Sequence, residues 1–485
     1  MPVRVAPLAS GPGRWLLRTA LLWMSIALVA CSSLPTRESL RATTADEARV
    51  TVHGASGPVA PAQEARAIDA VAAEGTEGLM RAHLRVLSAG GDVDLYRGNQ
   101  TRLLVDGPAT FGAMKAAISK ARRRILLESY IVEDRGVAAE IAALLLRKAA
   151  EGVQVALIYD AVGSIATPEA FFRNLADGGV ATCSFNPIKP TQQRPGYWNI
   201  VHRDHRKLLV VDDEVAFTGG FNISRVYGSG SSSRSRAGPR PSGEDALDDG
   251  WRDTQIELRG PAVPAMSRLF AATWREQGCR SADGDLGAAA SSKGAPRRAG
   301  EPGERVVKLL ASDPRDPINR IYTALLGAVE ASRRSVRLTM GYFAPGPDFV
   351  GALCDAARRG VQVELVLPGR SDFALILHAG RSYYTQMLEA GVKLYEMEHA
   401  TMHAKTAVID GVFSTVGSSN LDWRSLVSNS ELNVVILGDD FGQQLEALFA
   451  RDRAASVPID AAKWRQRGLK QRSLEWVGRA AERLL

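Results

Sequence analysis

The sequence predicts an α/β protein built from two similar α/β/α sandwich repeats. Residues 117–160 read as helix, apolar strand, helix and second apolar strand, and residues 328–369 read as the same four elements in the same order. A strand–helix–strand unit that occurs twice is typical of a duplicated α/β domain. At 485 residues the chain is also longer than one hydrophobic core usually organises, so we expect two or three domains.

Composition and charge exclude several classes of protein. Hydrophobic residues make up 45% of the chain and charged residues 23%, which excludes a disordered, collagen-like or polytopic membrane protein. The formal net charge of +7 is too small to indicate a nucleic-acid partner from charge alone, so none is expected.

The chain begins with a segment typical of an exported protein. Arg14 and Arg18 precede an uncharged run from Thr19 to Ala30, which fits the ~7–15-residue apolar region of a secretory signal and is shorter than the ~20 residues that span a bilayer. The run ends in Leu-Val-Ala-Cys31, which resembles the lipobox of bacterial lipoproteins. We expect residues 1–30 to be a signal peptide and Cys31 to carry a lipid anchor, facing the periplasm or cell exterior. A plain signal or a short uncleaved anchor is the alternative.

The remaining segments follow in order along the chain. A polar tether with a helical stretch near 62–87 is expected before the first repeat. Each repeat contains a Gly-Val-Gln-Val segment, at Gly152 and Gly360, where glycine suits the end of a helix before a buried strand. A stretch poor in large apolar residues separates the repeats as a flexible linker. The predicted boundaries are 31–100 for the tether, 101–280 for the first half, 281–303 for the linker, 304–460 for the second half and 461–485 for a C-terminal tail.

One motif occurs at the same place in both repeats. A histidine is followed by a lysine two residues later, an aspartate five residues after the lysine, and an asparagine seventeen residues after the histidine. The two sets are His205, Lys207, Asp212 and Asn222, and His403, Lys405, Asp410 and Asn420. A single His-x-Lys pair is common by chance, whereas a duplicated block that keeps the asparagine offset is not.

The spacing of the motif suits a phosphodiester substrate. Histidine and lysine two residues apart on a strand project from the same face. Two facing halves would line one site with two imidazoles, two cations and two amides, which are convergent donors for the charge that builds on phosphate oxygens. One imidazole can attack phosphorus while the other protonates the leaving oxygen.

The duplicated blocks resemble the paired motifs of the phospholipase D superfamily over roughly residues 100–460. The resemblance implies phospholipase D-like repeats with mixed sheets, related by a pseudo-twofold axis, with one active site at their interface. It also implies a phosphohistidine intermediate and neither a metal ion nor another cofactor. His205 and His403 become the catalytic pair, with His205 as the nucleophile. Phosphate binding is assigned to Lys207, Lys405, Asn222, Asn420 and, in the second half only, Ser418.

Four carboxylates receive different expectations from the resemblance. Asp212 and Asp410 are counted with the catalytic motif, although in the family they usually have an architectural role at the far end of the strand. Glu431, in Asn-Ser-Glu431, is expected to orient the histidine of the second half. Asp253, in Trp-Arg-Asp253-Thr, is expected to orient that of the first half.

Several stretches are similar to bacterial cardiolipin synthases, including Ala216–Ser224 and Asn420–Ser425. This similarity implies transfer of a phosphatidyl group from one phosphatidylglycerol to another, with anionic phospholipid and the membrane surface as partners and glycerol as the product released. A hydrolytic phospholipase D or an extracytoplasmic nuclease, with water as acceptor, is the rival enzyme. A non-catalytic lipid-binding scaffold is the rival of another class; intact His, Lys and Asn in both copies argue against it.

Two further expectations concern the cysteines and the C-terminus. Cys183, Cys279 and Cys354 are expected to be free, because three cysteines left after lipidation do not form a complete disulfide set. The tail at 461–485 carries seven basic and two acidic residues among aromatic and aliphatic ones. This pattern fits an interfacial helix on an anionic membrane and, equally, a terminal helix packed on the second half. A monomer is expected.

Overall fold

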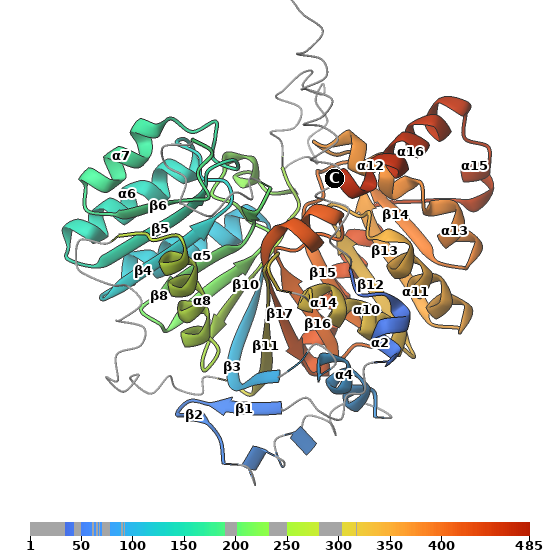
Figure 1. The fold of residues 1–485 in the computed structure, drawn as a ribbon, viewed down its shortest axis with the longest axis horizontal. Coiled ribbons are helices and arrows are strands. Elements are labelled where there is room, and N and C mark those ends of the chain that lie inside the picture. The colour runs from blue at the N-terminus through green and yellow to red at the C-terminus, as the bar shows by residue number, and fades with distance from the viewer. Residues whose placement is uncertain are drawn as a thin grey trace, which may run out of the picture.

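A computed structural model gives the fold (Figure 1). The predicted signal peptide with Cys31, residues 281–302 of the predicted linker and a serine-rich segment at 232–249 lie outside the described residues. The structure describes residues 34–42, 50–60, 63–64, 66, 68–69, 78–88, 91, 93–189, 201–231, 250–280, 303–316 and 318–485.

The first half is a mixed sheet covered by helices on both faces. Its strands lie in the order β6-β5-β4-β8-β9-β10-β3, with parallel pairs among β4, β5 and β6 and antiparallel pairs elsewhere. Helices α5 and α6 pack on one face and α8 on the other. The bounds are β3 (Val93–Val105), α5 (Asp106–Lys120), β4 (Arg124–Ser129), α6 (Val137–Ala150), β5 (Gln154–Asp160), α7 (Glu169–Asp177), β6 (Ala181–Phe185), β7 (Arg203–Asp204), β8 (Lys207–Val211), β9 (Val215–Gly219), η2 (Arg225–Tyr227), β10 (Thr254–Arg259) and α8 (Val263–Glu276).

The second half repeats this sheet strand for strand, in the order β14-β13-β12-β15-β16-β17-β11. Antiparallel pairing of β11 with β3 joins the two sheets, which stand side by side in Figure 1. Helices α8 and α14 share one hydrophobic cluster that spans both halves. The predicted two-repeat fold is therefore confirmed. The bounds are β11 (Arg305–Ser312), α10 (Arg320–Ala331), β12 (Ser335–Met340), α11 (Gly346–Arg358), β13 (Gln362–Pro368), α12 (Ala374–Arg381), α13 (Tyr384–Glu389), β14 (Lys393–Met397), β15 (Lys405–Ile409), β16 (Phe413–Gly417), η5 (Arg424–Ser428), β17 (Asn429–Leu437), α14 (Asp439–Ala454) and β18 (Val457–Pro458).

The predicted glycine turns are confirmed in both halves. Gly152 follows α6 with a φ of +83°, and Gly360 follows α11 with a φ of +92°, the left-handed region that glycine enters at low cost. Their amides donate to the carbonyl oxygens of Ala149 and Ala357 at 2.9 Å. Each turn therefore ends a helix and starts the next buried strand.

The expectation of a tether over residues 31–100 is wrong where the structure describes this segment. Strand β3 begins at Val93 and pairs with both β10 and β11, so it belongs to the sheets. Strand β1 (Val50–Gly54) pairs with β3 and with β2 (Gly57–Pro58), while α4 (Leu79–Ser88) buries its apolar face against the second half. Short helix α2 (Arg37–Ala42) is held by ion pairs from Arg37 to Glu330 and Asp355.

The expectation that all three later cysteines are free is also wrong. Cys183 in β6 and Cys279 after α8 form a disulfide with their Cα atoms 5.7 Å apart, and Cys354 is free and buried. Counting cysteines could not find this bond, because 96 residues separate partners that only the packing of α8 behind β6 brings together.

The C-terminal segment is helical and packed. It forms α15 (Ala461–Arg465), α16 (Leu469–Ala481) and the short η6 (Glu482–Leu484). In Figure 1, α16 lies over α12, and the C-terminus reaches the junction of the two halves. Within the described part of the chain, we find no helix with the length and hydropathy needed to cross a bilayer.

Candidate active site

The two motif histidines meet at the junction of the halves, just before strands β8 and β15. Each is fixed there by the backbone of the other half. The amide of His205 donates to the carbonyl of Ser430 at 2.9 Å, next to a short parallel pairing of β7 with β17. The amide of His403 donates to the carbonyl of Arg252 at 2.9 Å, beside a parallel bridge between Arg252 and Met402. One site therefore contains both copies of the motif.

The carboxylates that hold the imidazoles come from the opposite halves. Nδ1 of His205 lies 2.8 Å from Oε1 of Glu431, and Nδ1 of His403 lies 2.7 Å from Oδ2 of Asp253. The expected pairing within each half is wrong, because the chain before each histidine runs beside the carboxylate of the other half. An ionised carboxylate only accepts, so each Nδ1 carries its proton and each Nε2 keeps a lone pair for chemistry.

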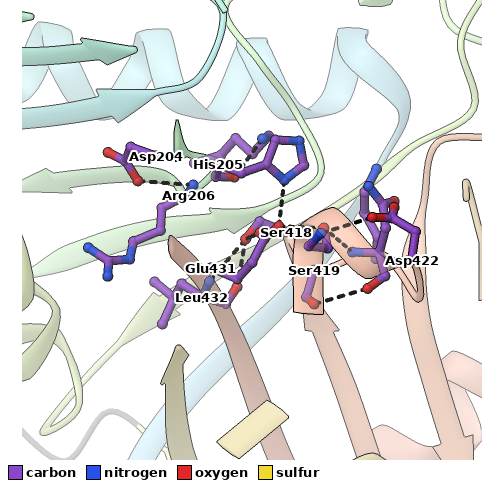
Figure 2. A network of polar contacts seen from close by, with 12 residues as sticks. Asp204, His205, Arg206, Ser418, Ser419, Asp422, Glu431 and Leu432 are labelled. Carbon is purple, nitrogen blue, oxygen red and sulfur yellow. Dashed lines mark hydrogen bonds and ion pairs between the residues drawn. The ribbon is translucent and has the colours of Figure 1, made fainter. Parts of the chain in front are cut away.

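The two dyads are not equivalent. Glu431 accepts hydrogen bonds from the hydroxyls of Ser418 and Ser425 as well as from His205 (Figure 2). Asp253 instead accepts the amide of Thr254 at 2.7 Å. Ser418, expected to bind phosphate, thus supports a carboxylate in this structure. Its counterpart Gly220 cannot be a serine as packed, because a Cβ there would lie 2.1 Å from Oδ1 of Asp253.

Burial tunes the charge of the site. Burial lowers the pKa of His205 to about 4 despite the attraction of Glu431, so its imidazole is neutral near pH 7. Burial also lowers the pKa of His403, and the motif lysines act in the same direction. Glu431 has its pKa lowered, since His205 and Lys207 outweigh the effect of burial, and it is ionised.

The two motif lysines lie beside the histidines with almost no exposure to solvent. Lys207 Nζ donates to the carbonyl of His205 at 2.6 Å, and Lys405 Nζ donates to the carbonyl of His403. Burial lowers the pKa of Lys207 to about 7 and of Lys405 to about 8, and Lys405 contributes to the shift of Lys207. Two buried lysines whose charges repel each other are stabilised by an anion, so this arrangement favours an anionic ligand.

Sequence comparison identifies the family. A family model for the cardiolipin synthase, phospholipase D-like domain matches residues 114–227 and 325–453. A cardiolipin synthase of Geobacillus sp. (strain WCH70) is 32% identical over 387 residues, which cover 80% of this chain and 72% of that protein. Cardiolipin synthase A of Pseudomonas putida is 32% identical over 383 residues, 78% of this chain and 73% of that protein. The chain belongs to the phospholipase D-like cardiolipin synthase family.

A solved structure agrees at the level of the fold. The phosphatidylserine synthase of Haemophilus influenzae Rd KW20 superposes with a TM-score of 0.59 at 14% identity, covering 84% of this chain and 98% of that one. With the family established, the chain is a phosphatidyltransferase of the phospholipase D superfamily. Among the described residues no cluster of three or more His, Cys, Asp or Glu side chains could hold a metal ion, and metal-free catalysis remains a prediction.

The motif asparagines lie in the same site, with different local partners. Oδ1 of Asn222 accepts the amide of Ile131 at 3.2 Å, and its Nδ2 lies 3.4 Å from the hydroxyl of Tyr227. Oδ1 of Asn420 is buried and has no hydrogen-bond partner. Phosphate binding by both asparagines stays a prediction, which their burial beside the histidines favours.

The motif aspartates have the architectural role and are not catalytic. Asp212 accepts three successive amides at 122–124, each at 2.8 Å. Asp410 accepts amides at 333–335 and is 3.1 Å from Nε2 of His83, which is fully buried. Both aspartates have a positive φ, 55° and 56°, and close the turn at the end of β8 or β15 that is remote from the histidine.

Sequence reasoning missed several side chains of the site. The hydroxyl of Tyr227 lies 3.2 Å from Nδ1 of His403, and the ring of Trp251 lies 5.0 Å from the imidazole. Tyr130 packs edge-on against His205 at 5.1 Å. Ser425, which donates to Glu431, lies in the stretch Asn420–Ser425 that is similar to cardiolipin synthases. No pattern in the sequence indicated that Tyr227 belongs to the site. These aromatic rings contact both histidines, which are 8% and 5% exposed.

Proposed function

We propose that the protein makes cardiolipin from two molecules of phosphatidylglycerol and releases glycerol. The observation that carries the proposal is the pair of crossed histidine–carboxylate dyads, with both motif lysines buried beside the histidines. The relatives whose printed name is cardiolipin synthase support the choice of substrate.

The chemistry proceeds in two balanced steps. Nε2 of His205 attacks phosphorus of the first phosphatidylglycerol, the bond to the glycerol oxygen breaks, and Nε2–H of His403 gives that oxygen its proton. Glycerol leaves, and His403 then removes the proton from a hydroxyl of a second phosphatidylglycerol, whose oxygen attacks phosphorus and frees His205. Lys207 and Lys405 hold the phosphate oxygens as charge builds on them.

The proton on His403 depends on the substrate. Burial and the lysines keep its pKa low in the empty site. A phosphodiester anion bound beside the imidazole compensates the lysines and raises the pKa, so the acid forms with its substrate in place.

We also propose that the enzyme works outside the cytoplasm as a lipid-anchored monomer. The disulfide between Cys183 and Cys279 supports this location, because disulfides persist in oxidising compartments. One chain supplies both dyads, which supports a monomer. Cys31 lies outside the described residues, and labelling with a radioactive fatty acid, in the natural chain and in Cys31→Ser, tests the anchor.

The test of the activity is to incubate the purified protein with phosphatidylglycerol alone and to separate the products. Cardiolipin and glycerol in equal amounts are expected. Phosphatidate without cardiolipin would instead make water the acceptor and the protein a hydrolase. No product, with a folded protein, would favour the non-catalytic scaffold.

A further inference from the structure

The C-terminal helix presents an apolar stripe to solvent. Leu469 is 81% exposed, Trp476 72%, Val477 46% and Leu484 56%. Trp476 and Val477 follow Leu469 by seven and eight residues along α16, which places the three on one side of a helix that turns about 100° per residue, and Leu484 follows in η6. Exposed apolar residues gathered in this way mark a surface for interaction rather than a random surface composition.

The charge around the stripe is of one sign. The two acids of this segment are buried: Glu475 accepts from Arg467 at 2.9 Å, and Glu482 accepts from the hydroxyl of Tyr383 at 2.6 Å. The cations that remain exposed between 463 and 485 are Lys463, Arg465, Lys470, Arg472 and Arg483. An apolar stripe flanked by exposed cations, with no exposed acid in the segment, complements an anionic lipid surface.

The helix is fixed with respect to the active site. Gly478 lies against α12 so closely that a Cβ would be 2.5 Å from the backbone nitrogen of Ala379. The carbonyl of Leu485 accepts the amide of Arg424 at 2.8 Å, and Leu485 packs on Ala344, two residues after Tyr342. The ring of Tyr342 lies 6.1 Å from that of His403. Figure 1 shows the C-terminus at the junction of the two halves.

We propose that α16 and η6 form a docking surface for an anionic phospholipid bilayer and hold the junction of the halves, where the active site lies, against it. In this proposal the tail is both a packed terminal helix and an interfacial helix, because one face packs on the second half while the other faces lipid. The proposal rests on the proposed function for its substrate class. Lipid acyl chains stay in the bilayer while the phosphate reaches the buried histidines, so the junction must lie at the membrane surface.

A fluorescence experiment on the full chain tests the surface directly. In a Cys31→Ser background, an environment-sensitive dye is attached to the cysteine of Trp476→Cys. Cys354 is buried, and Cys183 and Cys279 are bonded to each other, so none of the three reacts with the dye. The matched control is Lys120→Cys, an exposed position near the turn that Asp212 closes, at the opposite end of β8 from His205.

With vesicles of phosphatidylglycerol and phosphatidylcholine, we expect a blue shift and quenching by lipid-borne quenchers for the dye at 476 and neither at 120. High salt or pure phosphatidylcholine should reverse the response. Replacing Lys470 or Arg472 with Gln should weaken vesicle binding about fivefold for each cation. A dye at 476 that stays in water while the vesicle lipid is converted would overturn the proposal.

A second variant distinguishes a role in membrane docking from a role in stabilising the fold. Trp476→Ser combined with Leu484→Ser should lower turnover of vesicle phosphatidylglycerol at least tenfold and leave turnover of a monomeric short-chain phosphatidylglycerol unchanged. Equal loss on both substrates would assign α16 to the core and overturn the docking surface. Insertion of the dye at 476 without any turnover would support docking and overturn the proposed activity, so the two failures are distinguishable.

Discussion

The crossed pairing of histidines and carboxylates makes a prediction that a pairing within each half does not. Glu431→Gln keeps the size of the side chain and removes the charge that faces His205 at 2.8 Å. When His205 becomes a phosphohistidine its ring turns cationic, and a unit negative charge about 4 Å from it contributes about 4 kcal/mol at an effective dielectric constant of 20. Loss of that stabilisation corresponds to about a thousandfold in rate.

A substrate with an activated leaving group separates the two dyads. A p-nitrophenyl phosphodiester needs little protonation of its leaving oxygen, so formation of the phosphohistidine should survive in Asp253→Asn, which weakens the acid His403. The same step should remain about a thousandfold slower in Glu431→Gln, because the nucleophile is impaired. Stopped-flow release of p-nitrophenol measures the step. Rescue of Glu431→Gln with no rescue of Asp253→Asn would refute the crossed assignment of roles.

Three further predictions follow from the site and its frame. On a soluble substrate, kcat/KM should rise through pH 4 as His205 loses its proton. It should fall as the pH rises further, because the free enzyme loses the acid proton of His403, whose pKa is lowered, and above about pH 7–8 also loses the charges of Lys207 and Lys405. Reducing the Cys183–Cys279 bond should lower the free energy of unfolding by about 2–4 kcal/mol, measured by urea denaturation. Gly220→Ser should lower both the thermal midpoint and kcat, since its Cβ would displace the carboxylate that holds one imidazole.

Each of these predictions has a control and a contrary outcome. A kcat/KM that stays constant to pH 10 would mean that the lysines keep their ordinary pKa. If dithiothreitol frees the thiols of Cys183 and Cys279 without changing the free energy of unfolding, the disulfide does not stabilise the fold. Gly112→Ala, on the exposed side of α5 with no atom within 4 Å of the new Cβ, should leave activity unchanged and so isolates the effect at position 220.

The sequence predicted the features that depend on local pattern. The duplicated strand–helix–strand order, the glycine turns at 152 and 360 and the paired His-x-Lys blocks all follow from spacing along one segment, and the structure contains each of them. The family resemblance implies an architectural role for Asp212, although the residue is counted with the catalytic motif, and its contacts at the strand end remote from the histidine agree with that role. Hydrophobic periodicity and motif spacing depend only on residues close together in the sequence, so these features could be predicted without knowledge of tertiary contacts.

The remaining features depend on contacts between distant segments. The exchange of Glu431 and Asp253 between the halves follows from the short β7–β17 pairing and from the parallel bridge between Arg252 and Met402, which no local pattern predicts. Strand β3 is rich in polar residues and precedes the first recognisable repeat, so its sequence resembles a tether, and only its pairing with β10 and β11 makes it part of the sheets. The hydrogen bond between His83 and Asp410 forms because α4 packs on the second half, and no pattern in the sequence indicates that packing.

The most direct test of the proposed mechanism is to trap the intermediate. The full chain is mixed with phosphatidylglycerol, quenched within milliseconds in alkali, which preserves phosphohistidine, and its peptides are mapped by mass spectrometry. A phosphatidyl adduct on His205 is expected, and it should be strongly reduced in Glu431→Gln. When a p-nitrophenyl phosphodiester replaces phosphatidylglycerol, the adduct should still form in Asp253→Asn. An adduct on His403, or catalytic turnover with no adduct on either histidine, would contradict the account.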